Sequence, residues 1–130
     1  MAQVNTNTND SDSITSILAK NINVATTAAF VTNLDVDARL IRDGELFIHN
    51  VTAGDLDYQV LVTTEDYDAV VLPTGTNDDD KGWVVHSSAS IASAAAIAEI
   101  TFAKTYTRII VQIKHTTATT DVNVWFNGVR

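Results

Sequence analysis

The chain has 130 residues and a formal net charge of −8 at pH 7, and it contains no cysteine. This length fits one domain with one core, and without cysteines neither disulfides nor thiolate metal sites can form. An acidic chain is repelled by phosphate backbones, and no apolar run approaches the ~20 residues that span a bilayer, so we expect neither nucleic acid nor a membrane as a partner.

The chain begins with a polar stretch of low complexity in which Val4 is the only branched apolar residue. Such a segment cannot bury enough surface to offset its ordering entropy, which predicts an extended N-terminal arm in residues 1–13. It also lacks the basic start and apolar middle of a signal peptide, so we expect a protein made in the host cytoplasm and used without Sec export. The arm is predicted to dock onto a neighbouring chain through backbone and amide contacts, with Val4, Asn5 and Asn7 as interaction residues.

The pattern from residue 13 to residue 50 predicts strands. Short alternating runs in residues 13–34 favour short strands, although the signals there are mixed. Asp43-Gly44 stands between the runs 38–42 and 45–50, and this dipeptide suits a type I′ turn, which needs φ > 0 at both central residues. We therefore predict a two-residue hairpin at Asp43-Gly44.

Further strands and a long loop follow. Residues 58–63 alternate, and residues 69–72 are predicted to be the next strand, which Pro73 ends because proline has no amide to donate. The acidic, glycine-bounded segment 74–82 is predicted to be a surface loop, after which the chain re-enters as a strand at 83–88.

The last third of the chain carries the strongest alternation. An alanine-rich segment at 90–96 is compatible with a strand or with one helical turn, and residues 97–103 read as a strand. Residues 106–115 and 121–128 alternate apolar and polar side chains, and a short polar link joins them. They are predicted to form a hairpin.

These runs amount to eight or nine short strands, the number expected of a two-sheet sandwich or jelly roll. Aspartate outnumbers glutamate thirteen to three, a bias that favours turns and strands because glutamate is the better helix former. The sequence therefore predicts an all-β fold: a two-sheet, jelly-roll-like β-sandwich in residues 14–130, preceded by the arm 1–13.

No group of residues has the spacing of a catalytic or metal site. The loop 74–82 offers oxygen ligands of the kind Ca²⁺ takes, but its spacing departs from the helix–loop–helix calcium pattern, so a solvated loop is favoured over a calcium site. His49, His86 and His115 are each isolated in a predicted strand, and the serines after His86 lack the glycine frame of a nucleophile elbow. We predict no enzymatic activity, no bound metal and no cofactor.

The two tryptophans differ in their surroundings. Trp83 is predicted to fill the core, the usual place of a strand tryptophan in a sandwich. Trp125 falls on the same side of its strand as Asn123 and Asn127, an arrangement typical of a sugar-stacking surface or of a subunit interface. We favour the interface, and predict Asn123, Trp125 and Asn127 as interaction residues.

The run 107–113, the threonine-rich link 116–120 and the run 121–128 together resemble the closing strands of small β-sandwich virion proteins of tailed phages, especially capsid decoration (cement) proteins. The resemblance spans residues 97–128, about a quarter of the chain. It implies a jelly-roll-like homo-oligomer, most often a trimer, on the outer capsid surface of a virion, with the major capsid protein as its partner and no catalytic residue. The alternative is a carbohydrate- or receptor-binding module that uses Trp125 and the aspartate loops.

Overall fold

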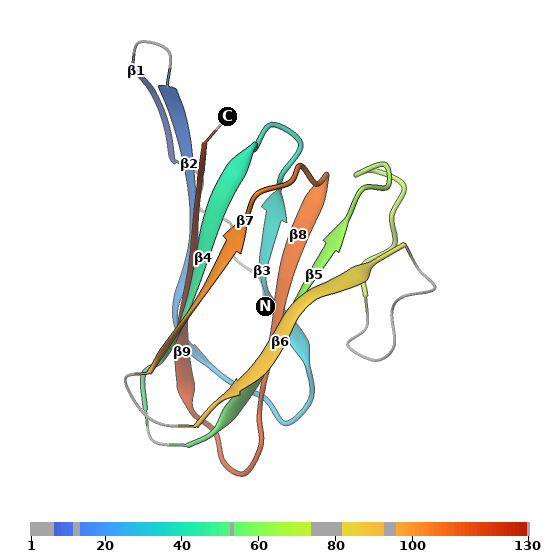
Figure 1. Cartoon of the computed structure of the whole chain (residues 1–130). Helices are drawn as coiled ribbons and strands as arrows, with labels where there is room; N and C mark the ends of the chain where they lie inside the picture. Colours follow the sequence, from blue (N-terminus) through green and yellow to red (C-terminus); the bar gives the residue numbers. More distant parts are fainter. Residues whose placement is uncertain (1–6, 12–13, 53, 74–81, 93–95, 130) are drawn as a thin grey trace.

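The computed structural model describes residues 7–11, 14–52, 54–73, 82–92 and 96–129, and every regular element in them is a strand (Figure 1). The nine strands are β1 (Asn7–Ser11), β2 (Ile14–Ala25), β3 (Val31–Asp37), β4 (Asp43–Asn50), β5 (Leu56–Thr63), β6 (Val84–Ile91), β7 (Ile97–Phe102), β8 (Arg108–His115) and β9 (Asp121–Val129). None of the described residues belongs to a helix of the length and apolarity that crossing a membrane requires.

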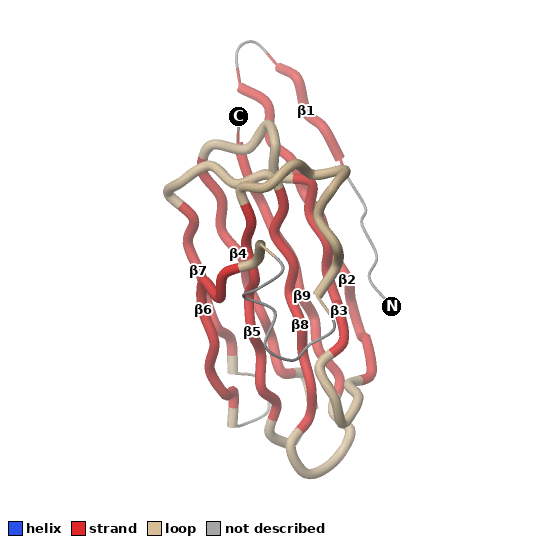
Figure 2. The backbone as a smooth tube through the Cα atoms, turned by 90° about the vertical axis from the view of Figure 1, so that its right-hand side faces the viewer, coloured by secondary structure: helices blue, strands red, loops and turns tan. Residues whose placement is uncertain are grey.

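The strands form two antiparallel sheets packed face to face. One sheet has the order β1-β2-β9-β4-β7 and the other has the order β3-β8-β5-β6. Apart from β5 and β6, consecutive strands after β2 lie in opposite sheets, so the chain winds around the sandwich as a jelly roll does. Seen from the side, the strands run along the long axis of the molecule (Figure 2). The predicted all-β, jelly-roll-like sandwich is confirmed.

Part of the expected arm lies in the first sheet. Residues Asn7–Ser11 form β1, which pairs with the start of β2 from Asn7 opposite Leu18 to Ser11 opposite Ile14. Together β1 and the start of β2 project beyond the other strands (Figure 1). Residues 1–6 and 12–13 of the expected arm lie outside the described residues.

The core fills the space between the two inner sheet faces. Alternate residues of β8 and β9 point into it, as the period-two pattern requires, namely Ile109, Val111 and Ile113 from one sheet and Val122, Val124 and Phe126 from the other. The predicted hairpin between residues 106–115 and 121–128 is nevertheless wrong, because β8 and β9 lie in opposite sheets. Their link crosses the end of the sandwich, where Thr120 donates its amide to Thr26 Oγ1 (3.0 Å) and its hydroxyl to Asn50 Oδ1 (2.8 Å).

The predicted hairpin at Asp43-Gly44 is also wrong. Both residues lie inside β4, where Gly44 pairs with Phe102 on one side and Gly128 on the other. The glycines with positive φ in the described part of the chain are Gly54 and Gly82. Gly44 serves another purpose, because a Cβ atom there would lie 2.5 Å from Cζ of Phe126. The position needs space for a core ring, not a left-handed turn.

Residues 69–72 do not form the predicted strand. They belong to the segment 64–73, which folds over the outer face of the second sheet, with Val70 packed against Leu61, Trp83 and Ile110. Trp83 does not fill the core between the sheets as predicted; it is fully buried under this segment and donates its indole Nε1–H to the carbonyl of Val71 at 2.8 Å. The apolar run is buried by lying on a sheet instead of by joining one.

The other predicted segments are placed as follows. The strand expected at 83–88 is β6, and the one expected at 97–103 is β7. Most of the predicted loop 74–82, residues 74–81, lies outside the described residues. In the segment left open at 90–96, Ser90 and Ile91 end β6, and residues 93–95 lie outside the described residues.

Candidate interaction surface

The outer face of the five-stranded sheet carries a pair of stacked aromatic rings at its centre. Phe47 of β4 and Trp125 of β9 are direct cross-strand partners. Their ring centroids are 5.3 Å apart and the ring planes are inclined by only 19°. Such a pair contributes about 0.5–1.5 kcal/mol beyond its area burial, so each ring holds the other in place before any ligand arrives. The prediction that Trp125 points away from the core is confirmed.

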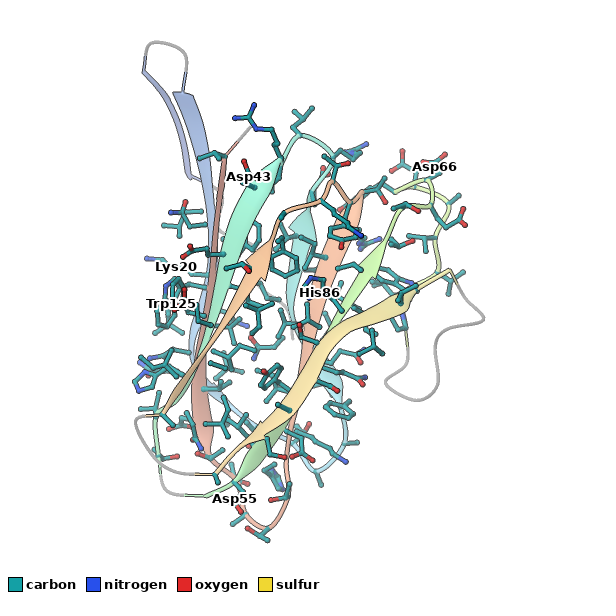
Figure 3. The ribbon with its side chains drawn as sticks, in the orientation of Figure 1. Lys20, Asp43, Asp55, Asp66, His86 and Trp125 are labelled. Carbon is teal, nitrogen blue, oxygen red and sulfur yellow. The ribbon has the colours of Figure 1, made fainter. Side chains whose placement is uncertain are left out.

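The stacked pair belongs to a row that crosses four strands. Lys20 of β2 pairs with Trp125, and Glu99 of β7 pairs with Phe47. Directly paired residues of an antiparallel sheet point to the same face, so the row presents a cation, two rings and an anion in that order. Both end residues are exposed, and Figure 3 shows Lys20 and Trp125 side by side on the side away from the second sheet.

Two further rows flank the central one. On one side Asn127, Glu45 and Thr101 are paired across β9, β4 and β7, and on the other Asn123, His49 and Ile97 are paired in the same way. Ile22 lies beside the second flanking row, in the irregular stretch of β2 between Asn21 and Val24, and Ile22 and Ile97 remain 45% and 56% exposed. We call this surface the aromatic face; its members are Lys20, Ile22, Glu45, Phe47, His49, Ile97, Glu99, Thr101, Asn123, Trp125 and Asn127.

The two sheets differ in what covers their outer faces. The segment 64–73 closes the outer face of the second sheet over Ile110, Trp83 and Gln112, and Gln112 Nε2 donates to the carbonyl of Pro73 at 3.4 Å. No described segment of the chain lies in this way over Phe47 and Trp125, both of which stay partly exposed. The aromatic face therefore stays uncovered by the described part of the chain.

The structure brings three of the predicted interaction residues together. Asn123, Trp125 and Asn127 all lie on the aromatic face, where Asn127 is exposed and Asn123 Oδ1 accepts a hydrogen bond from the amide of Asn23 at 2.7 Å. Asn23 has a φ of 56°, so Asn123 braces an irregular stretch of β2. Asn7 of β1 pairs with Leu18 of β2, and Leu18 pairs with Asn127 of β9. Asn7 therefore belongs to the same cross-strand row as Asn127.

Val4 and Asn5 lie outside the described residues. Sequence reasoning missed Phe47, Lys20 and Glu99. The alternation of Glu45, Phe47 and His49 was a usable signal, because it sets Phe47 on the polar side of β4 as surely as Asn123 and Asn127 do for Trp125.

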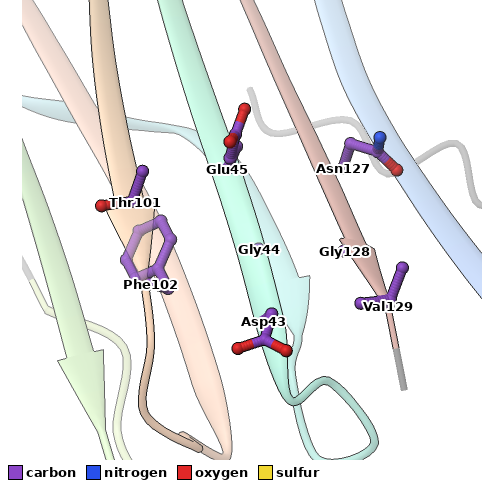
Figure 4. A pocket seen from close by; sticks show the side chains of 8 residues that line it. All are labelled: Asp43, Gly44, Glu45, Thr101, Phe102, Asn127, Gly128 and Val129. Carbon is purple, nitrogen blue, oxygen red and sulfur yellow. The ribbon is translucent and has the colours of Figure 1, made fainter.

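A shallow hollow adjoins the aromatic face where β4 begins and β9 ends. It measures about 320 Å³, and Gly44 and Gly128 lie at its centre as direct cross-strand partners (Figure 4). Asp43, Glu45 and Asn127 are among its rim residues. The hollow thus offers two carboxylates and an amide, a set that suits a small polar or cationic group.

A larger hollow of about 460 Å³ lies at the edge of the sandwich beside β6. Within it the ring of His86 packs on Phe102 (centroids 4.6 Å apart), and burial lowers the pKa of His86. His86 Nδ1 lies 2.8 Å from Ser87 Oγ. The described residues that line this hollow include no aspartate or glutamate, so the His86–Ser87 pair lacks the acidic group that orients the base in a catalytic triad. The imidazole of His86 packs against the rings of Phe102 and Tyr106.

A cluster of charged side chains around Tyr67 holds the covering segment 64–73 in place. The ring of Tyr67 lies between the guanidinium groups of Arg39 and Arg108, at 4.5 and 4.6 Å from the ring centroid. Arg108 forms a two-point ion pair with Asp35 (2.8 and 2.6 Å) and Arg39 forms one with Asp37 (2.9 and 2.6 Å). The hydrogen bond from Arg39 lowers the pKa of Asp37. These charges are internally paired, which identifies the cluster as a structural clamp.

The described residues contain no group of three or more histidines, aspartates or glutamates arranged to hold a metal ion.

Comparison with known proteins shows a shared fold. No family model and no curated protein matches the chain. Among solved structures, a chain of the Bacillus endospore appendages, a family of disulfide-linked pili, aligns with 92% of this chain and 91% of its own, with a TM-score of 0.52 and 13% identity. The SPBc2 prophage-derived protein YomS aligns with 88% of this chain and 95% of its own, with a TM-score of 0.49 and 12% identity. A chain of infectious bursal disease virus, strain Gx, aligns over 92% of this chain but only 32% of its own (TM-score 0.47, 12% identity). At such identities the likeness concerns the fold alone.

Proposed function

We propose that the protein is a non-enzymatic structural component of a virion, a decoration (cement) protein that binds the outer capsid surface and stabilises the shell. The observation that carries this proposal is the aromatic face. Its stacked rings are ordered in advance and stand among exposed isoleucines, amides and charges. Protein interfaces are enriched in tryptophan and phenylalanine, and preordered aromatic anchors carry much of their binding energy.

The fold and the charge of the chain support the same proposal. The jelly-roll sandwich has the architecture that the resemblance to decoration proteins implies. A net charge of −8 suits the outside of a particle better than a place beside packaged DNA. In the proposed assembly the arm contacts the major capsid protein, and the body contacts other copies of itself; the trimer that the resemblance implies stays a prediction.

The proposal is tested on purified virus particles from the culture whose genome encodes the chain. We expect the protein to band with the particles in a density gradient, in a copy number comparable to that of the shell proteins. Antibodies raised against the purified protein should label the outside of intact particles. Absence of the protein from the particle band, or its complete protection from protease in intact particles, would contradict the proposal.

Two variants link the particle experiment to the aromatic face. Replacing Phe47 and Trp125 together with alanine should reduce the amount of protein recovered with the particles. Val84→Ala is the matched control, since Val84 is 64% exposed but lies on β6 of the other sheet. Equal loss in both variants would show that the face has no special role.

A second candidate function is a carbohydrate- or receptor-binding module. It is favoured by the position of Trp125 between Asn123 and Asn127, beside the hollow that Asp43 and Glu45 help to line. Against it, Phe47 stacks on one face of the indole and leaves less of the ring free for a sugar. Binding on a glycan array that is lost in Trp125→Ala would favour this alternative over the decoration protein.

A further inference from the structure

We propose that the aromatic face binds a second copy of itself in a two-fold symmetric dimer. The axis of this dimer runs parallel to the strands, in the plane between the two faces, and passes between Phe47 and Trp125. The inference rests on the proposed function only in taking this face to be a protein contact; it does not require a capsid.

The central row is self-complementary under such an axis. Its order is Lys20, Trp125, Phe47, Glu99 across β2, β9, β4 and β7. A two-fold rotation about a line along the strands reverses this order in the second copy. Lys20 of each copy then lies over Glu99 of the other, and each Trp125 lies over the other copy's Phe47. An isologous interface requires this property, because the same patch must fit itself.

The flanking rows obey the same rule. In one of them the reversal sets the amide of Asn127 against the carboxylate of Glu45, a donor against an acceptor. In the other it sets Asn123 against His49, and it brings exposed Ile97 of β7 over the irregular stretch of β2 that holds exposed Ile22. Hydrogen-bonding groups therefore meet near the axis in both flanking rows, and the two exposed isoleucines approach each other at one outer end.

Other arrangements of two faces do not share this match. An axis across the strands would place Lys20 over Lys20 and Glu99 over Glu99, which costs free energy because like charges repel. The axis along the strands also agrees with the way sheets stack, since two packed sheets keep their strand directions within about 30° of each other. The distribution of charge therefore selects one orientation.

Lys20 and Glu99 are too far apart to form an ion pair with each other within one copy. They stand on strands separated by three spacings of about 4.8 Å, roughly 14 Å in all. Within the described residues neither of them takes part in an ion pair. Any coupling between these two side chains must therefore pass between copies, which makes them suitable probes of the dimer.

The area of the aromatic face determines how tightly the two copies are expected to associate. Four strands spaced about 4.8 Å apart and about five residues of 3.3 Å rise give roughly 300 Å² of flat area per copy. This is below the ~800 Å² per partner of a standard interface. The two copies also carry −8 each, a repulsion that salt screens. We therefore expect a dimer that dissociates on dilution and forms more readily at moderate than at low ionic strength.

The test is a charge exchange followed by sedimentation velocity, from about 10 µM to about 1 mM protein. Wild type should pass from monomer to dimer in this range. Lys20→Glu and Glu99→Lys each turn two attractive pairs into two repulsive ones, and should weaken association about tenfold or more. The double variant Lys20→Glu/Glu99→Lys restores both pairs and should regain the dimer, as should an equimolar mixture of the two single variants.

Controls separate the interface from folding and from the proposed function. Glu65→Lys makes the same carboxylate-to-ammonium change as Glu99→Lys, but on an exposed residue far from the aromatic face. It should leave association no weaker than in wild type. Melting curves of all variants should coincide, because the exchanged residues are exposed. A wild type that stays monomeric to 1 mM, or whose association is unaffected by the single variants, overturns the dimer. Recovery of the protein with virus particles would in each of these cases leave the decoration role standing.

Discussion

Alanine at Gly44 is expected to destabilise the fold by crowding the ring of Phe126. The Cβ atom would lie 2.5 Å from Cζ and 2.8 Å from Cε2 of that ring, closer than carbon atoms approach in proteins. The ring has little room to withdraw, because Phe126 is fully buried and packs on Phe102 at a centroid distance of 5.8 Å. Either the ring or the backbone of β4 must move.

The size of the effect follows from two opposing terms. Overpacking a core typically costs about 1–3 kcal/mol. Replacing glycine with alanine lowers the conformational entropy of the unfolded chain, and this offsets the loss of stability by about 0.4–1 kcal/mol. The net loss for Gly44→Ala is then about 1–2 kcal/mol, which lowers the melting temperature of a domain of this size by roughly 3–8 °C. Urea unfolding and thermal melts measure the two quantities independently.

A second substitution identifies the cause. Phe126→Leu destabilises the protein by itself, since it leaves a cavity, but in its presence the extra methyl group of Gly44→Ala should cost little or nothing. Gly54→Ala is the matched control: Gly54 has a φ of +129°, and the nearest atom to its Cβ is 3.5 Å away, so its penalty should be the same with Phe126 or leucine. An unchanged melting point for Gly44→Ala, or a penalty that Phe126→Leu leaves intact, would refute the steric argument.

Three further predictions concern the clamp and the arm. Tyr67→Ala should lower stability by about 1–2 kcal/mol in urea unfolding, since two cation–π contacts of about 0.5–1 kcal/mol each disappear, whereas Tyr67→Phe should be nearly neutral; equal effects would exclude these contacts. Because Arg39 lowers the pKa of folded Asp37, this carboxylate adds stability at neutral pH that is lost as the pH falls below the ordinary value of 3.8, so Asp37→Asn should show a shallower acid-side decline than wild type. A parallel decline would contradict this. Deleting residues 2–12 removes the edge strand β1 and should leave the melting point nearly unchanged while reducing binding to undecorated capsids; unfolding of the truncated chain would place β1 among the elements that hold the domain together.

Alternation in the sequence was sufficient to predict which side of a strand faces the core. It sets Val122, Val124 and Phe126 inward and Trp125 outward, as the structure has them. It could not predict which strands are neighbours, because the period of two is the same whether the next strand pairs in the same sheet or crosses to the other. The hairpin predicted between residues 106–115 and 121–128 failed for this reason. The hairpin predicted at Asp43-Gly44 failed because Gly44 makes room for the ring of Phe126 inside β4 and is not part of a left-handed turn.

One residue in the sequence indicates that the outer face of the second sheet is covered, but strand propensity alone does not reveal what covers it. Ile110 interrupts the alternation of β8, and it is buried on the outer side against Leu61 and Trp83. The partner for this extra apolar residue is the run 69–72, which reads as a strand because it is rich in valine. Only the tertiary structure shows that the run lies on the sheet.

The candidate site depends on strand order more than on any single strand. The alternation within each of the strands β2, β9, β4 and β7 predicts which of its side chains face outward. The order of charges across the sheet, however, is set only when these strands lie side by side. The jelly-roll winding places Lys20 and Glu99 at opposite ends of one row, with both rings between them. A charge pair split in this way gives nothing to the isolated fold, because its members are too far apart to attract each other appreciably in water. The chain covers one outer sheet face with its own segment 64–73 and leaves the other with stacked rings between opposed charges, and these charges lower the free energy only when a second surface supplies their complement.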